Sequence, residues 1–181
     1  YLQQVLRLAP QTAGLVLAIQ PVVQALASPW AGRLSDRVAS RIVASAGMAT
    51  TAVGLGLVAG MPGQAPVAWT VGSLILLGLG FGLFSSPSTN AVMGAVEPPL
   101  YGVAAATVST MRLTGQTLST GIATLLFALH LGGRPLTEAP VEALIAAQRS
   151  AFILFAVLCV IGTLASLARG SEERHERRDA G

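Results

Sequence analysis

No charged side chain occurs in residues 42–96, which read IVASAGMATTAVGLGLVAGMPGQAPVAWTVGSLILLGLGFGLFSSPSTNAVMGAV. A helix needs about 20 apolar residues, at about 1.5 Å each, to cross a hydrocarbon core about 30 Å thick. The uncharged run is long enough for two such helices. It is interrupted by MPGQAP at residues 61–66, where two prolines and a glycine predict a tight connection. We therefore predict membrane spans at residues 42–60 and 67–95.

The rest of the chain has the same apolar character. Of its 181 residues, 52% are hydrophobic and 10% are charged. A typical soluble domain has roughly 25% charged residues, so the composition excludes an ordinary water-soluble protein. Three more apolar runs predict spans at residues 12–31, 102–131 and 150–168. We therefore expect an all-α integral membrane protein, with a lipid bilayer around its spans.

The segments outside the five spans are short. Residues 1–10 resemble the outer end of a further helix whose body precedes this sequence, so the bundle is expected over residues 1–168. Between the last two spans, helix-forming residues after Pro140 predict a short surface helix in an outer loop. Residues 169–181 form a mixed-charge tail, which we expect to be solvated.

The arginines predict how the spans are oriented. If the connection after the first span is cytoplasmic, the inner side carries seven arginines, namely Arg33, Arg37, Arg41, Arg169, Arg174, Arg177 and Arg178. The outer side then carries three, namely Arg7, Arg134 and Arg149. Basic residues are enriched in cytoplasmic loops, so this orientation is preferred and the C-terminus is expected in the cytoplasm. These clusters fit anionic lipid better than nucleic acid, which we do not expect as a partner.

Catalytic and metal-binding chemistry has little support in the sequence. Cys159 is the single cysteine, which excludes an internal disulfide and a cysteine-based metal cluster. The two histidines, His130 and His175, are far apart and have no second ligand at metal spacing. No nucleophile, base and acid are arranged for catalysis. We therefore expect no enzyme, no metal and no cofactor.

Polar and small residues follow one face of several predicted spans. In the fourth span they are Ala105, Ser109, Arg112, Gln116, Ser119 and Ala123, at steps of three and four. The third span carries Gly78, Gly82, Ser86, Asn90 and Gly94, and the first carries Gln20, Gln24 and Ser28, all at steps of four. Polar side chains in a membrane normally face other helices or a water-filled cavity. The first, third and fourth spans are therefore predicted to line a polar interior, with the second and fifth more peripheral.

The same stripes allow a second interpretation, in which they are seams where helices pack closely. Arg112 in particular has structural alternatives, because its side chain can extend to the cytoplasmic interface or pair with Glu97 or Asp36. The candidates for the wall of a substrate cavity are Gln20, Gln24, Ser86, Asn90, Arg112 and Gln116.

Residues 32–41, GRLSDRVASR, connect the first two spans and carry the first resemblance. The pattern is similar to the G-x-L-x-D-R-x-G-R-R loop, or motif A, of the major facilitator superfamily. Its matching residues are Gly32, Leu34, Asp36, Arg37 and Arg41. Ala39 replaces the second glycine and Ser40 replaces a basic residue, departures typical of the weaker copy in the C-terminal half. The resemblance implies that Asp36 and Arg37 belong to a cytoplasmic gate.

Two longer stretches resemble one branch of that superfamily, the fourteen-span drug/proton antiporters of the EmrB/QacA type. They are residues 77–96 with residues 101–123, and the opening YLQQVLRLAPQTAGLVLAIQP. The resemblance implies that the five spans are the last five helices of a transporter whose N-terminal half is absent from this sequence. In that fold the second, fourth and fifth helices of each half approach the central cavity, which agrees with the polar stripes.

The resemblance implies a multidrug efflux transporter of the plasma (inner) membrane that exchanges small amphipathic compounds for protons. The proton gradient is its expected energy source, and any embedded carboxylate must come from the absent half, because none of the predicted spans has an acidic residue in its interior. A major facilitator for a metabolite is the first alternative. A membrane half-bundle without transport activity, such as a scaffold or sensor, is the second.

Overall fold

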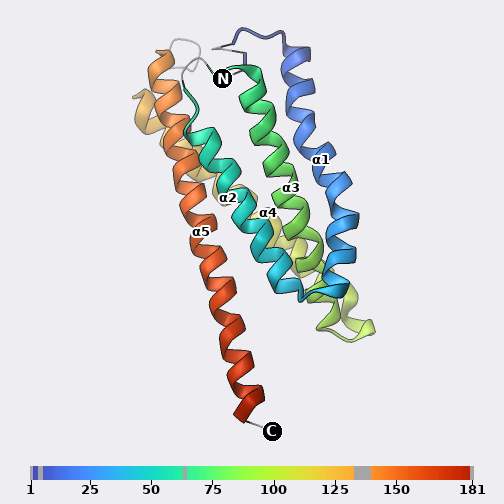
Figure 1. Cartoon of the computed structure of the whole chain (residues 1–181). Helices are drawn as coiled ribbons and strands as arrows, with labels where there is room; N and C mark the ends of the chain where they lie inside the picture. The colour runs from blue at the N-terminus through green and yellow to red at the C-terminus, as the bar shows by residue number, and fades with distance from the viewer. Residues whose placement is uncertain (1, 4–5, 63–64, 133–139, 180–181) are drawn as a thin grey trace.

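The computed structural model describes the chain except residues 1, 4–5, 63–64, 133–139 and 180–181; the side chains of Asp36 and of residues 167–179 also lie outside the described part. The elements are α1 (Pro10–Arg37), α2 (Ser40–Ala59), α3 (Val67–Gly94), the short 3-10 helix η1 (Pro98–Leu100), α4 (Tyr101–Leu131) and α5 (Val141–Asp179). No strand occurs among the described residues. The predicted all-helical fold is therefore confirmed (Figure 1).

Local sequence sets most helix ends. Pro10 stands at the start of α1, where its missing N–H would have no partner in any case. The break predicted at residues 61–66 separates α2 from α3. At the end of α4, Gly132 adopts φ 59°, the left-handed conformation that lets a chain leave a helix without a steric penalty on a side chain. The first four predicted spans therefore agree closely with α1 to α4.

The fifth helix corrects one expectation. The surface helix predicted after Pro140 and the span predicted at 150–168 form one continuous helix, because good helix formers link them without a glycine or proline. The backbone of α5 also remains helical through Asp179, into the segment predicted as a solvated tail. Residues 133–139 of the predicted outer loop lie outside the described residues.

The opening segment has no helix over its described residues. Residues 2 and 3 are in a turn, and the N–H of Leu8 donates to the carbonyl of Leu2 at 3.0 Å. The sequence suggested the end of a further helix at residues 1–10. A helical end has few hydrogen bonds of its own and forms only as a continuation of preceding turns, which this sequence does not contain.

Four of the helices are long and apolar enough to cross a membrane. These segments are Pro10–Ser35, Ser40–Ala59, Val67–Gly94 and Val141–Ser166. Helix α4 falls short in apolar content, although its 31 residues cover the span predicted at residues 102–131. Its threonines, serines, Arg112 and Gln116 lower its hydropathy, so a membrane span at α4 stays a prediction.

Glycines of α3 bring this helix into close contact with two neighbours. A Cβ atom added at Gly78 would lie 2.6 Å from the Gln20 carbonyl oxygen of α1, and one at Gly82 would lie 2.8 Å from Ala27 Cβ. Gly80 faces the other way, where an added Cβ would lie 2.7 Å from the Thr51 nitrogen of α2. Because these positions lack side chains, α3 packs between α1 and α2 with backbones nearly touching (Figure 1).

Helix α5 attaches to this three-helix core through α2. The Ser45 hydroxyl lies 2.9 Å from the Ser166 hydroxyl of α5, and the Met48 side chain packs on Gly162. Helix α4 contacts mainly α5 and makes few contacts with α3, and it crosses behind α2 and α3 in Figure 1. Near its end the Ser150 hydroxyl lies 3.2 Å from His130 Nε2. Helix α4 is therefore the least enclosed element of the bundle.

The described surface is apolar and the interior is made of small residues. Large side chains such as Leu15, Leu26 and Trp30 are exposed on α1, whereas Ala13 and Ala31 are buried. This distribution reverses that of a water-soluble protein and suits helices that present large apolar side chains to lipid tails.

We expect Gly80→Ala to destabilise the protein by about 1–3 kcal/mol, the usual penalty of overpacking. The new methyl group would overlap the backbone of α2 around Thr51 and Gly47. The matched control is Gly56→Ala, a helix-interior glycine around which no neighbouring atom lies within 4 Å. Thermal unfolding of the full-length protein in detergent, followed by tryptophan fluorescence, measures both. Equal melting temperatures for the two variants would contradict the packing argument.

Candidate functional site

Most of the motif at residues 32–41, which the sequence placed in a loop, is helical. It occupies the last turns of α1, the two-residue link of Val38 and Ala39, and the first turn of α2. An added Cβ at Gly32 would lie 3.3 Å from the Ser86 Oγ of α3, so this glycine allows the two helices to approach. Arg37 is exposed in the last turn of α1, where its positive charge interacts favourably with the negative end of the helix dipole.

Two other members of the motif, Leu34 and Arg41, lie on either side of the link between α1 and α2. Leu34 is exposed, and its carbonyl accepts the N–H of Val38 at 2.9 Å as α1 ends. Arg41 is half-buried in the first turn of α2. The side chain of Asp36 lies outside the described part of the structure, so its proposed gate contacts stay a prediction.

Arg112 is the charged group placed most deeply along α4. It lies eleven residues after Tyr101, about 16 Å along the helix at 1.5 Å per residue. Its side chain is exposed, and its Nη2 donates to the Ser85 Oγ of α3 at 3.1 Å. This hydrogen bond is the connection between α3 and α4 that the sequence did not predict, since Ser85 lies one position away from the stripe containing Ser86 and Asn90.

The other predicted cavity residues are divided between two environments. Gln20 and Gln24 are half-buried on α1, and their backbone carbonyls lie against Gly78 and Gly82 of α3. Ser86 is half-buried beside Gly32. These three residues therefore flank a packing seam between α1 and α3, the alternative interpretation of the stripe.

The two remaining candidates lie on open surface of the described structure. Asn90 of α3 and Gln116 of α4 are exposed. Gln116 follows Arg112 by one helical turn, so these two share a face of α4. Arg112 and Gln116 therefore lie on the same exposed face of α4, whereas Asn90 lies on α3.

A row of threonines on α4 was missed at the sequence level. The row consists of Thr107, Thr110, Thr114, Thr117, Thr120 and Thr124. Each hydroxyl donates to the carbonyl four residues earlier, at 2.8 to 3.0 Å. The hydroxyl protons are thereby satisfied within the helix, so the row presents methyl groups and acceptor oxygens. The spacing of these threonines by three and four residues can be read from the sequence. Their hydrogen bonds to backbone carbonyls are known only from the structure.

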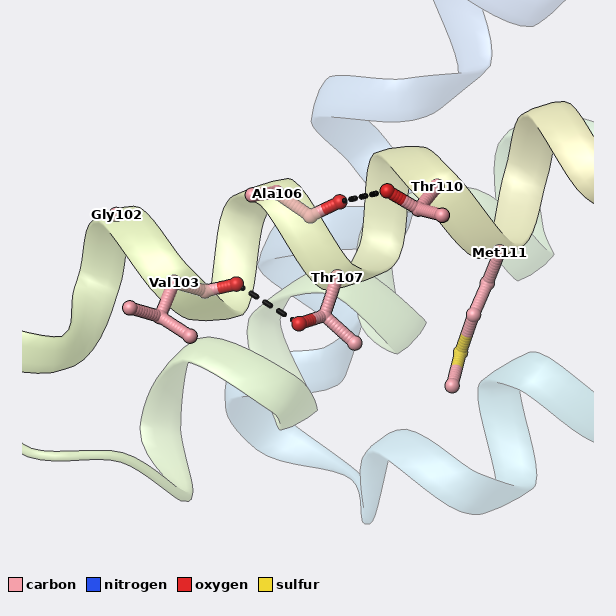
Figure 2. Close-up of a pocket in the computed structure, with 6 residues that line it drawn as sticks. All are labelled: Gly102, Val103, Ala106, Thr107, Thr110 and Met111. Atoms are coloured by element: carbon pink, nitrogen blue, oxygen red, sulfur yellow. Dashed lines mark hydrogen bonds between the residues drawn. The ribbon is translucent and has the colours of Figure 1, made fainter.

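Two open grooves follow α4 along this row. One has a volume of about 530 Å³ and is lined by six residues of the inner half of the helix, shown in Figure 2: Gly102, Val103, Ala106, Thr107, Thr110 and Met111. The other, of about 770 Å³, is lined by Gln116, Thr117, Thr120, Gly121, Thr124, Leu125 and Ala128. Both are lined by α4 alone and lie open on its surface.

The described residues contain no group of three or more histidine, cysteine or acidic side chains placed to hold a metal ion. The polar side-chain groups on α4 are hydroxyls, the amide of Gln116, the guanidinium of Arg112 and the imidazole of His130. Such groups bind and orient a polar molecule through hydrogen bonds and charge. The arrangement therefore favours binding of a small molecule along α4.

Comparison with known proteins agrees with the motif and the helical topology. The sequence matches the Major Facilitator Superfamily over residues 1–181. The chain belongs to the major facilitator superfamily. It is a multi-pass membrane protein and a partial helical bundle of that superfamily.

The chain is similar to part of each of two curated transporters. The chain is 27% identical over 164 residues to the riboflavin transporter RibZ of Clostridioides difficile (strain 630), covering 91% of this chain and 36% of RibZ. It is 32% identical over 126 residues to the uncharacterized transporter YebQ of Escherichia coli (strain K12), covering 70% of this chain and 28% of YebQ. The chain spans about a third of the length of the curated relatives it matches.

Cysteine labelling distinguishes a cavity wall from a lipid-facing surface. In a Cys159→Ser background, we expect Gln116→Cys to react with a membrane-impermeant maleimide several times faster than Ile161→Cys. Both positions are exposed in the structure, but a thiol ionises and reacts only where water reaches it. Labelling of the full-length protein in membranes measures the rates, and equally slow reaction at both positions would show that water does not reach this face of α4 and would contradict a cavity wall.

Proposed function

We propose that this chain is the C-terminal part of a secondary active transporter that exports drugs or other small amphipathic compounds in exchange for protons. The membership in the major facilitator superfamily supports transport. The resemblance of residues 77–96 and 101–123 to the EmrB/QacA type supports the drug/proton branch. The proposed location is the plasma (inner) membrane, with the cytoplasmic side at the arginine-rich ends of α1 and α2.

The polar, exposed face of α4 is the observation that carries the proposal. A helix of 31 residues with Arg112 and Gln116 on one face is costly to expose to lipid, because the bilayer core offers no hydrogen-bond partners. Water and a polar substrate supply those partners if α4 lines a central cavity. The N-terminal half of the same protein would form the opposite wall, and rocking of the two halves would open the cavity to each side in turn.

In this proposal the inner end of the bundle acts as a gate. The motif containing Gly32, Asp36 and Arg37 lies at the end shared by the link from α1 to α2 and the link from α3 to α4 (Figure 1). Charge and helix-dipole contacts made there would hold the outward-facing state and break when the cavity opens inward. Proton coupling would use groups of the N-terminal half together with this motif.

Transport in cells tests the drug/proton proposal directly. Bacteria lacking their major efflux pumps and producing the full-length protein are expected to accumulate several times less ethidium than cells with an empty vector. A protonophore is expected to abolish the difference, because the driving force is the proton gradient. Ethidium accumulation equal to that of the vector control, with the protein present in the membrane, would contradict this proposal.

A second candidate substrate is riboflavin, favoured by the 27% identity to RibZ over 91% of the chain. It corresponds to the metabolite alternative considered from the sequence. Growth of a riboflavin-requiring strain on low riboflavin, with and without the protein, separates this candidate from drug export. Rescue of growth without ethidium efflux would identify riboflavin, rather than drugs, as the transported compound.

We expect Asp36→Asn to lower the transport rate several-fold without reducing the amount of protein in the membrane. The substitution removes a negative charge near the C-terminal end of α1 and leaves the side chain nearly the same size. Glu97→Gln is the matched control, because it removes an exposed negative charge from the link between α3 and α4. Equal transport rates for both variants and the unmodified protein would contradict the proposal that Asp36 belongs to a gate.

A further inference from the structure

We infer that Arg112, held by Ser85, binds a carboxylate or phosphate group of the transported compound. This inference rests on the proposed transport function and adds a substrate class to it. The cargo would then include amphipathic organic anions, whose acidic group contacts the guanidinium of α4, beside cations such as ethidium.

The charge of Arg112 lacks a counter-charge among the described residues. A guanidinium remains protonated in proteins and has five N–H donors. The hydrogen bond of Arg112 is to the neutral hydroxyl of Ser85, at 3.1 Å, and no described acidic side chain forms an ion pair with it. Of the two acidic partners considered from the sequence, Glu97 is exposed in the link before α4, and the side chain of Asp36 lies outside the described residues. An unpaired charge inside a membrane is strongly unfavourable, so an anion at this position would be stabilised.

The hydrogen bond to Ser85 orients the guanidinium for such an anion. One nitrogen, Nη2, is directed at α3, which limits the rotation of a long side chain. The remaining donors keep the planar fork that matches two oxygens of a carboxylate or phosphate. A side chain fixed before binding loses less conformational entropy when the ligand arrives.

The surroundings of Arg112 suit an amphipathic compound rather than a simple inorganic ion. Ser109 and Gln116 lie about one helical turn before and after it on the same face, and both are exposed. Gln116 also lines the larger groove, which continues past Thr120 to Ala128. An acid held at Arg112 can therefore place its uncharged part along Ser109 and Gln116, and Gln116 in turn borders this groove.

A phospholipid headgroup offers the same phosphate chemistry as a cargo phosphate. Arg112 lies about 16 Å along α4 from its inner start, which argues for a site within the bundle rather than at the membrane surface. The experiment therefore includes neutral and anionic lipid, so that the two sources are distinguished.

Protection from an arginine reagent tests the inference without requiring transport. The full-length protein, in nanodiscs of phosphatidylcholine, is treated with phenylglyoxal, and modification of Arg112 is followed by mass spectrometry of its peptide. The probes are 2-naphthoate and its methyl ester, which has the same ring system but no charge. We expect 2-naphthoate to slow modification of Arg112 several-fold and the ester to have no effect. Arg33, exposed near the end of α1, is the internal control and is expected to react equally throughout.

Two serine variants test the role of the hydrogen bond. Ser85→Ala removes the acceptor of Arg112 and is expected to reduce the protection by 2-naphthoate several-fold. Ser86→Ala is the matched control, because its hydroxyl lies beside Gly32 of α1, and it is expected to retain full protection. Equal protection in the two variants would show that Ser85 does not position the guanidinium.

Three results would overturn the inference. The first is equal modification of Arg112 with the acid and the ester. The second is protection by phosphatidylglycerol nanodiscs with no added effect of 2-naphthoate, which would assign Arg112 to a lipid headgroup. The third is no modification of Arg112 under any condition, which would mean that another part of the protein encloses it. Failure of ethidium or riboflavin transport is measured separately, so a wrong function and a wrong anion site give different results.

Discussion

Close backbone contact through the glycines of α3 is the constraint on which the bundle depends. Membrane helices gain little from burying apolar side chains, because lipid tails are equally apolar. They associate instead where small residues allow many van der Waals contacts. Gly78 and Gly82 provide this toward α1, and Gly80 provides it toward α2. A side chain at any of these three positions would push α3 away from α1 or α2 near the middle of α3.

This tight core leaves α4 with a different role. The three-helix core and α5 are connected through α2, whereas α4 makes few contacts with α3 and is largely exposed over residues 101–121. The hydrogen bond from Arg112 to Ser85 fixes one point of the loosely packed helix against the core. A rigid core with one polar, open helix is a suitable wall for a cavity that must admit and release a substrate, which is why α4 carries the functional proposal.

The sequence predicted the number and extent of the long helices because its signals are local. Uncharged runs, prolines and glycines located the ends of α1 to α4 to within a few residues. The separate helix expected before α5 was wrong, because an amphipathic turn and an apolar span look different in composition but have the same backbone conformation. The helix end expected at residues 1–10 stays a prediction, because residues 1 and 4–5 lie outside the described residues.

The site residues show where local signals end. The sequence by itself determined that the chain is a helical membrane protein, that its charges gather at helix ends, and that Arg112 is an exception within α4. Hydropathy and helical period are properties of consecutive residues, so they were sufficient for this. Only the tertiary structure decided that Gln20, Gln24 and Ser86 flank a packing seam, and that Ser85 rather than its neighbour meets Arg112. Those outcomes depend on how two helices are rotated against each other, and the glycine contacts between helices set that rotation.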